Sequence, residues 1–323
     1  MSTVISVQDL SKSFFVTKRQ GWKYAFRTHI VDTIVALKDI KLIISKGEFV
    51  ALLGPNGAGK STLIKILIGV LAQSNGSVRI IGKDPLEEHN YVMKHIGVVF
   101  GQRSRLWYDL PVKESFELTK RLYISGYPRV HLPHQKEWEE FLFESIDIVS
   151  IMDRQVKKLS LGERMRCELV NTLLYNPEII FLDEPTIGLD VVSKQKIREA
   201  LKILNKQGKT ILLTSHDTGD IEQLCERVII INHGMMVVDM SMKEFLQLST
   251  DVEIRLKLHT SPRGLEISEG IRKVSEFEVA INCKKTEIKD RMKFLLDTFD
   301  VEDISIQSEG VDEILSEIYQ KKN

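Results

Sequence analysis

The sequence predicts an α/β fold: a predominantly parallel sheet with flanking helices, followed by a small second α/β domain. Short apolar, strand-like runs recur through the first part of the chain, and helical patterns separate several of them. These runs cover residues 49–53, 96–100, 179–183, 210–215 and 228–232. A glycine-rich segment follows the first run, and two acidic residues follow the third, so polar groups stand at the edge where such sheets bind ligands.

The glycine-rich segment reads GPNGAGKS and spans Gly54–Ser61, which we call the phosphate loop. It matches G-x-x-x-x-G-K-[ST], with a strand-like run before it and a helix-like run, 61–71, after it. Its glycines let successive backbone N–H groups face a phosphate, and the following helix adds its positive dipole end. Lys60 is predicted to reach the β and γ phosphates of ATP, and Ser61 to ligate Mg²⁺. The alternative, an ordinary glycine-rich turn, is disfavoured by this Lys-Ser pair. The other predicted nucleotide contacts in this part of the chain are Gly54, Pro55, Asn56, Gly57, Ala58, Gly59 and Thr62.

An acidic pair ends the apolar run 179–183. Asp183 is predicted to hold Mg²⁺, and Glu184 to act as general base toward the attacking water. An apolar run that ends in two acids is weak evidence alone, because many strands end in solvated acids. Together with the phosphate loop, it predicts ATP hydrolysis.

The composition is that of an ordinary soluble protein. The chain has 323 residues, 43% of them hydrophobic, and its 45 basic residues balance 45 acidic ones. Global charge therefore favours no nucleic-acid partner. The first residues lack a signal peptide's pattern, and no apolar stretch approaches the about 18 residues that span a bilayer. Cys167, Cys225 and Cys283 lack disulfide or zinc spacing and are expected to be reduced, buried cytosolic thiols.

Two departures from the strand pattern suggest the domain organisation. Between Leu110 and Lys157 apolar residues fall at helical spacing with no convincing strand nearby. This predicts a helical subdomain, about 103–165, inserted into a sheet domain of residues 1–248. Residues 249–323 show two alternating strands, an amphipathic helix, a short strand and a closing helix. They predict a compact α/β appendage without a catalytic cluster.

An arm near the beginning of the chain, residues 18–29, interleaves basic and aromatic side chains. Such a segment can lie on an anionic membrane surface or touch a partner. The competing interpretation is a long hairpin loop whose aromatic rings cover neighbouring apolar surface. We favour the hairpin because the arm is short.

Four further features narrow the class of ATPase. Gln102 follows the run that ends at Phe100, where its amide oxygen can reach the metal and the attacking water. LSLGE, Leu159–Glu163, opens a helix whose N-terminus can accept a phosphate from another subunit. Gly188–Asp190 follows the acidic pair, and His216 ends the run 210–215, where its imidazole can hydrogen-bond a γ-phosphate.

With these motifs in this order, residues from about 4 to 248 resemble the ATP-binding subunits of ABC transporters. The matching segments are GPNGAGKS, the glutamine after the strand, LSLGE as the signature, IIFLDE, GLD and TSHD. The resemblance implies that Phe14 stacks on adenine and that Asp190 belongs to the nucleotide site. VVFGQRSRLWYDLPVKES and FLDEPTIGLDVVSK look more like the ABC-2 type, daunorubicin-resistance-like exporters.

The signature segment departs from the family's usual LSGGQ at two positions. Leu161 places a side chain where the backbone approaches a phosphate, and Glu163 adds negative charge nearby. Ser160 and Gly162, the residues best placed to touch the γ-phosphate, are retained.

The resemblance also implies a mechanism and partners. Two ATP-binding domains pair head to tail, so that residues 54–62 of one chain and Ser160–Glu163 of the other enclose each Mg-ATP. Glu184 then acts as base while Lys60 and His216 stabilise the developing charge. The partners implied are a homodimer mate or related ATPase subunit and a separate polytopic permease, at the cytoplasmic face of the membrane. The alternatives are a soluble ABC-type ATPase acting on DNA or ribosomes and a non-enzymatic ATP-gated module. The first group usually carries coiled coils, zinc cysteines or two nucleotide domains, and Glu184 speaks against the second.

Overall fold

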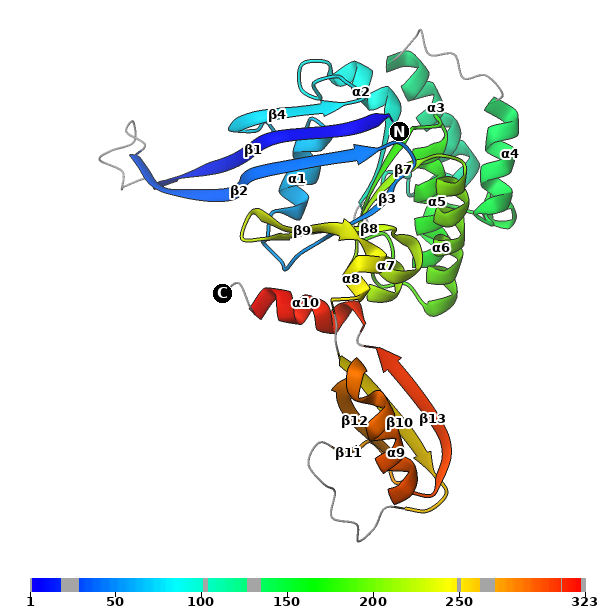
Figure 1. Cartoon of the computed structure of the whole chain (residues 1–323). Helices are drawn as coiled ribbons and strands as arrows, with labels where there is room; N and C mark the ends of the chain where they lie inside the picture. The colour runs from blue at the N-terminus through cyan, green and yellow to red at the C-terminus, as the bar shows by residue number, and fades with distance from the viewer. Residues whose placement is uncertain are drawn as a thin grey trace. The chain divides into compact units, whose positions relative to one another are not determined.

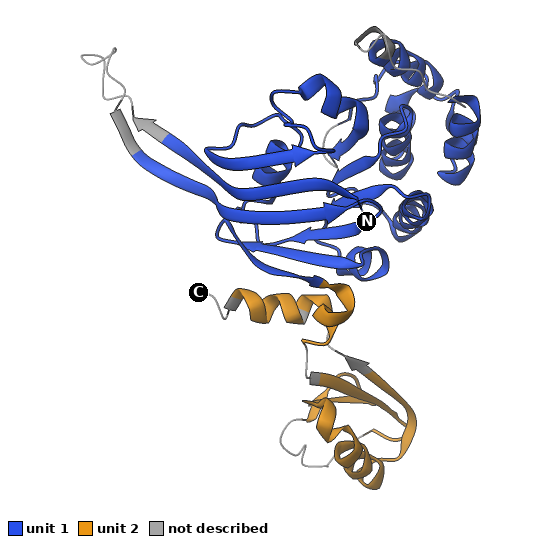
Figure 2. Ribbon diagram, turned by 45° about the horizontal axis from the view of Figure 1, so that its top comes forward, with its two compact units in different colours: residues 1–240 blue, residues 241–323 orange. Residues whose placement is uncertain are grey.

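The computed structural model describes residues 2–18, 29–100, 104–126, 135–248, 251–261, 271–308 and 310–320. The chain forms two compact units, Met1–Met240 and Ser241–Asn323 (Figure 2). The domain boundary that the sequence suggests after residue 248 stays a prediction. No helix among the described residues has both the length and the apolar character to cross a membrane.

The first unit is built on a six-stranded sheet in the order β5-β6-β7-β3-β8-β9. Figure 1 labels β3, β7, β8 and β9 of this sheet. The strands are β3 (Phe49–Leu53), β5 (Ile96–Phe100), β6 (Ile179–Asp183), β7 (Thr210–Thr214), β8 (Arg227–Asn232) and β9 (Met235–Ser241). From β5 through β8, every neighbouring pair is parallel. The five apolar runs of the sequence are therefore five neighbouring strands, which confirms the predicted fold class. Their carboxyl ends meet at one edge of the sheet.

A second, antiparallel sheet in this unit has the order β2-β1-β4. Its strands are β1 (Thr3–Lys18), β2 (His29–Ser45) and β4 (Asn75–Ile80). The sequence did not predict it, because register shifts between Val7 and Leu10 and again between Leu10 and Lys12 interrupt the period-two alternation that reveals a strand. Asp9, inside this stretch, has a φ of 49°. The arm predicted as a hairpin loop lies outside the described residues, except for the backbone of Lys18 and His29.

Helix α1 (Lys60–Leu67) lies in the main core of the first unit, which also includes residues of both sheets. Its buried side chains alternate with exposed ones at helical spacing, so one face contacts the sheet strands and the other faces outward. The buried residues of this helix are Leu63, Ile64, Ile66 and Leu67. A second short helix, α2 (His89–His95), precedes β5. Packing of α1 in the core therefore fixes the position of the helix start, where the phosphate loop ends.

The predicted helical insertion is present between β5 and β6 (Figure 1). It comprises α3 (Val112–Gly126), α4 (Gln135–Ser145), two 3₁₀ turns (Val149–Ile151 and Val156–Lys158) and α5 (Leu161–Leu173). Trp138 on α4 donates its indole N–H to the carbonyl of Leu173 at 2.7 Å. Gln135 donates to the carbonyl of Leu174 at 2.9 Å. Helix α4 thus satisfies carbonyl groups that the end of α5 leaves without helical partners.

Helices α6 (Val191–Lys206) and α7 (Thr218–Leu224) complete the first unit. Asp190 caps α6 by accepting a hydrogen bond from the Ser193 amide at 2.9 Å, and Asp217 caps α7. The cysteines are free and buried, as expected.

The second unit contains a four-stranded antiparallel sheet in the order β11-β12-β10-β13. Its elements are α8 (Met242–Leu246), β10 (Asp251–Leu258), β11 (Ile271–Lys273), β12 (Glu278–Lys284), a 3₁₀ turn (Lys285–Glu287), α9 (Ile288–Thr298), β13 (Val301–Ser308) and α10 (Val311–Gln320). Ile254, Leu256 and Ile281 on the sheet are buried together with Leu295 of α9. The alternation read from the sequence therefore marks the buried face of this sheet.

Candidate functional site

The phosphate loop joins β3 to α1 with a backbone that only glycine accommodates at two points. Gly54 has a φ of 149°, and a Cβ there would lie 2.1 Å from the carbonyl oxygen of Ile231. Gly59 has a φ of 110°, and its Cβ would lie 2.6 Å from the carbonyl oxygen of Ala36. Lys60 opens α1 and donates to the carbonyl of Gly54 at 2.5 Å and to that of Pro55 at 3.2 Å. The loop therefore holds the ammonium group against its own backbone.

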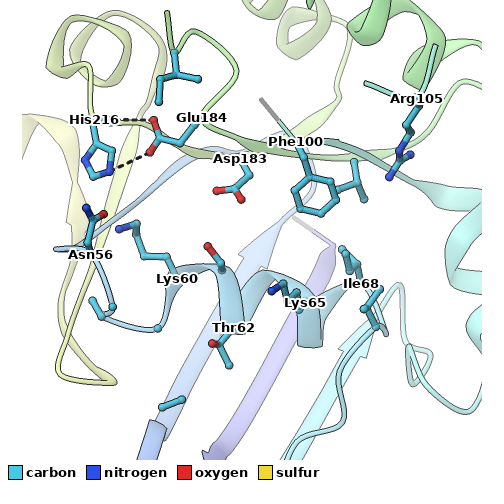
Figure 3. A pocket seen from close by; sticks show the side chains of 18 of the residues that line it. Asn56, Lys60, Thr62, Lys65, Ile68, Phe100, Arg105, Asp183, Glu184 and His216 are labelled. Carbon is cyan, nitrogen blue, oxygen red and sulfur yellow. Dashed lines mark hydrogen bonds and ion pairs between the residues drawn. The ribbon is translucent and has the colours of Figure 1, made fainter. Parts of the chain in front are cut away.

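A cavity of about 800 Å³ opens in front of this loop (Figure 3). The predicted site residues that line it are Asn56, Gly57, Ala58, Gly59, Lys60, Ser61, Thr62, Asp183, Glu184 and His216. These residues end or follow three different strands, β3, β6 and β7, whose carboxyl ends lie at one sheet edge. The volume is within the usual range of small-molecule and cofactor sites. The fold thus brings together side chains that the sequence separates by more than a hundred residues.

The two acids occupy different environments at the end of β6. One oxygen of Asp183, Oδ1, accepts a hydrogen bond from the Thr214 hydroxyl at 2.6 Å. Glu184 has a φ of 56°, a left-handed conformation that is uncommon outside glycine and that occurs preferentially at functional sites. Its amide donates to the carbonyl of Thr214 at 3.1 Å, which holds this conformation in place. The turn directs both carboxylates into the cavity (Figure 3).

Glu184 and His216 lie next to each other at one end of the cavity (Figure 3). The His216 amide donates to Oε2 of Glu184 at 3.2 Å, and its Nε2 lies 3.5 Å from Oε1. That Oε1 is buried and accepts no hydrogen bond from the described residues. Burial raises the pKa of Glu184, against the lowering influence of His216. A carboxylate with an open acceptor position and a raised pKa can take a proton from a water in the cavity.

Burial also affects the lysine of the loop. It lowers the pKa of Lys60 below its usual value, while the nearby charges of Glu184 and Asp183 oppose this effect. The ammonium and the two carboxylates thus share one partly buried space.

The signature segment lies at the start of α5 and does not line this cavity. Ser160 accepts a hydrogen bond from the Glu163 amide at 3.2 Å, and Glu163 accepts one from the Ser160 amide at 2.8 Å. This reciprocal capping box defines the first turn of the helix. At Gly162 a Cβ would lie 2.1 Å from the Ser193 hydroxyl, so the helix start packs closely on α6.

Five other predicted site residues are not among those that line the cavity: Gly54 and Pro55 of the phosphate loop, Phe14, Asp190 and Gln102. Phe14 is 39% exposed on β1, with the Lys12 ammonium 5.0 Å from its ring centroid. Asp190 is the cap of α6. Gln102 lies outside the described residues. The nucleotide and metal roles assigned from the sequence stay predictions for all site residues.

Arg105 was not predicted from the sequence, but it lines the cavity beside Phe100 at the end away from Lys60 (Figure 3). Its backbone is held by Glu168 on α5. Oε1 of that carboxylate accepts from the Arg105 amide at 2.8 Å, from the Leu106 amide at 3.2 Å and from the Ser104 hydroxyl. Burial raises the pKa of Glu168 although these three donors lower it. The sequence feature that could have indicated this contact is Glu168, an acidic residue among the apolar positions of a helix.

Asp220 on α7 was also missed. Its side chain is fully buried and accepts from Arg198 Nε at 2.6 Å, from the Ser215 hydroxyl at 3.1 Å and from the Thr186 hydroxyl. Thr186 follows Glu184, and Ser215 precedes His216. The Asp220 carboxylate therefore hydrogen-bonds both the loop that carries Glu184 and the loop that carries His216. Arg198 is its counter-charge.

Comparison with known proteins agrees with this geometry. Residues 37–187 match the family described as "ABC transporter". The chain is 35% identical over 204 residues to the ABC transporter ATP-binding protein NatA of Bacillus subtilis (strain 168), which covers 63% of this chain and 81% of that protein. It is 34% identical over 252 residues to a putative ABC transporter ATP-binding protein of Methanosarcina mazei, covering 75% of this chain and 84% of that one. The chain belongs to the ABC transporter family.

Solved ABC cassettes share the fold of this ABC protein. The dimeric structure of MJ0796, a bacterial ABC transporter cassette, aligns with a TM-score of 0.59 at 28% identity, over 73% of this chain and 98% of that one. The same cassette in a dimeric post-hydrolysis state bound to ADP and Pi aligns with a TM-score of 0.58 at 27% identity, over the same shares of the two chains. As a member of this family, the chain is an ATP-binding ATPase.

Proposed function

We propose that this ATPase powers an exporter of the ABC-2 type by hydrolysing ATP in the cavity and acting on a separate membrane permease. The observation that carries the proposal is the convergence of Lys60, Glu184 and His216 on one cavity. The export direction is supported by the resemblance of its sequence to daunorubicin-resistance-like exporters. Its place would be the cytoplasmic face of the membrane, held there by the permease.

In the proposed reaction the carboxylate of Glu184 accepts the proton of the attacking water. Lys60 stabilises negative charge that develops on the terminal phosphate oxygens, and His216 donates a hydrogen bond to them. The His216 amide keeps Glu184 oriented through Oε2. Asp220 holds the loops of Glu184 and His216 in their relative positions through its hydrogen bonds from Thr186 and Ser215.

The donor set in the cavity fits Mg²⁺. Asp183 has one oxygen fixed by Thr214, and its carboxylate is directed into the cavity near the start of α1 (Figure 3). Together with the Ser61 hydroxyl, and with Gln102 as the sequence suggests, it offers the hard oxygen ligands that this ion prefers. When bound, Mg²⁺ would neutralise charge on the phosphates.

The proposed site is completed by a second copy or a related ATPase subunit. The signature segment opens α5 with a capped N-terminus but does not line the cavity of its own chain. Apolar side chains are exposed around it: Leu161 is 39% exposed, and Val191 and Val192 at the start of α6 are 83% and 66% exposed. A surface of this kind favours a protein partner. MJ0796, a relative in fold, is described as dimeric.

The proposed contact with the permease is the exposed segment that comes just after Arg105 in the sequence. Arg105 lines the cavity, and Trp107 and Tyr108, two and three residues later, are 52% and 51% exposed. Arg164 donates to the Tyr108 hydroxyl at 2.5 Å, which fixes this ring on the surface. Exposed aromatic residues are typical of interface anchors. A change in the cavity would thus reach the permease through a segment that Glu168 holds to α5.

Trp107→Ala is expected to lose the permease while keeping ATP binding, because the ring is at the surface and Arg105 is held separately. The measurement is co-purification from detergent-solubilised membranes, with Phe277→Ala as the control. Phe277 is 45% exposed and lies in the second unit. Recovery of a polytopic membrane protein with the unmodified chain and the control, but not with Trp107→Ala, would support the proposal. Recovery of ribosomes or DNA in place of a membrane protein would contradict it.

The raised pKa of Glu184 predicts the acid side of the pH profile. The base works only when ionised, so kcat/KM should fall, on acidification, at a higher pH than an ordinary carboxyl's titration would produce. Glu184 binds its proton more tightly in the folded than in the unfolded chain, so its contribution to stability falls as pH rises through the window above the ordinary glutamate pKa of 4.5. Activity and stability should therefore move in opposite directions there. An acid limb at the position of an unshifted carboxyl would contradict the assignment of Glu184 as base.

A further inference from the structure

Glu163 places a carboxylate in the first turn of α5, where the proposed function puts the ATP of a second copy. ATP is strongly anionic, so an uncompensated carboxylate at this position would repel it. Repulsion would offset the favourable interaction between the helix N-terminus and a phosphate. The signature segment therefore requires a counter-charge for Glu163 if it is to complete the site.

Arg154, from the turn that precedes the signature segment, supplies this counter-charge. Its Nη1 donates to Oε1 of Glu163 at 2.6 Å. Its Nη2 donates to the carbonyl of Lys158 at 2.8 Å, so the guanidinium is anchored at a second point. Oε2 of Glu163 accepts from the Ser160 amide. Both oxygens of the carboxylate are thus engaged on the side of their own chain.

Other cations near this turn have different partners in the described structure. Arg164 follows Glu163 in sequence but donates to the Tyr108 hydroxyl and lies 5.7 Å from that ring's centroid. Lys113 pairs with Asp153 at 2.5 Å. Within the described residues, Arg154 is the cation that forms an ion pair with Glu163. Partial burial acts to raise the pKa of Glu163, but the hydrogen bonds from Ser160 and Arg154 outweigh it and hold that pKa below its usual value.

We propose that Arg154 is a positioning residue for ATP: it neutralises Glu163 and so allows the signature segment of one copy to approach the γ-phosphate bound by another. This inference rests on the proposed function, in which two copies share each ATP. It assigns the unusual acid of the signature and a preceding arginine to one charge-compensated unit. Removing only the arginine exposes the repulsion, and removing both charges restores a neutral helix start.

The test measures the ATP concentration at which Glu184→Gln protein half-dimerises, by light scattering with Mg²⁺ present. Adding Arg154→Gln is expected to raise that concentration by at least about tenfold, since one uncompensated charge near the phosphates is sufficient for such a change. Adding Glu163→Gln to Arg154→Gln should return it to within about threefold of the parent. Lys113→Gln, which breaks a neighbouring exposed pair, is the matched control and should leave it unchanged.

The melting temperature separates this role from a structural one. Arg154 is 43% exposed at its side chain, so losing this surface pair should shift the melting temperature by no more than a few degrees. If Arg154→Gln leaves ATP-driven dimerisation unaltered, or if Glu163→Gln fails to rescue it, Arg154 does not act by neutralising Glu163. If the parent Glu184→Gln protein itself stays monomeric with Mg-ATP, the proposal that two copies share each ATP is wrong, and so is this inference.

Discussion

Glu184→Gln is expected to lower kcat for ATP hydrolysis by about 10² to 10⁴ fold, the usual contribution of a general base. Glutamine has the same shape and can still accept the hydrogen bond from the His216 amide, so the cavity keeps its geometry. It cannot take a proton from water. ATP affinity should therefore change little, while phosphate release under saturating Mg-ATP nearly stops.

The control for this variant is Glu178→Gln. Glu178 immediately precedes β6, at the opposite end of the same strand, and pairs there with Lys46 at 3.5 Å and His95 at 3.1 Å. It is a partly exposed carboxylate away from the cavity, and its loss should leave kcat unchanged. If Glu184→Gln turned over ATP at the unmodified rate, Glu184 would not be the base.

Lys60→Ala is expected to weaken ATP binding by at least about 10² fold. The ammonium lies in the loop with its hydrogen bonds to the Gly54 and Pro55 carbonyls, and each charge-assisted bond that it can make to phosphate contributes about 1.5 to 3 kcal/mol. The measurement is titration calorimetry with ATP. The loss should be larger for ATP than for AMP, because Lys60 is assigned to the β and γ phosphates.

Lys46→Ala is the matched control for the lysine. It removes an exposed ammonium at the far edge of the sheet, where Lys46 pairs with Glu178. Its ATP affinity should equal that of the unmodified protein. Equal affinities for Lys60→Ala and Lys46→Ala would show that the loop lysine does not contact the nucleotide.

The strands of the six-stranded sheet could be predicted from the sequence because they are buried on both faces. β3 and β7 are buried at every position, and such strands appear as continuous apolar runs between glycine-rich or polar loops. The phosphate loop was readable because its residue types and its position between strand and helix coincide. Its glycines are required by close approaches, to Ile231 and Ala36, that no local pattern shows.

The antiparallel sheet β2-β1-β4 could not be predicted from the sequence, because bulges in β1 shift the alternation, so no uniform pattern runs the length of the strand. The supporting carboxylates were missed for a different reason. Glu168 contacts residues 62 to 64 positions earlier, and Asp220 contacts Thr186, 34 positions earlier. Sequence patterns report the face on which a residue lies but not its partner on another element. These contacts became visible only with the fold.

Glu163 illustrates the same limit. The sequence suggests a conflict, because an acid stands where the site should receive a phosphate. In the structure the acid is one half of a capping box and one half of an ion pair with Arg154. The negative charge of Glu163, which the sequence alone indicates to be unfavourable, is therefore compensated by Arg154 in the folded chain.

The most direct measurement is the mass of the Glu184→Gln protein in Mg-ATP, with and without Ser160→Arg. The chain has a mass of 37.0 kDa, and the account predicts that ATP roughly doubles the observed mass of Glu184→Gln. Ser160→Arg should prevent the doubling while leaving ATP bound to each single chain, because Ser160 does not line its own cavity. A Glu184→Gln protein that stays at the mass of one chain, or a doubling that survives Ser160→Arg, would contradict a nucleotide shared between two copies.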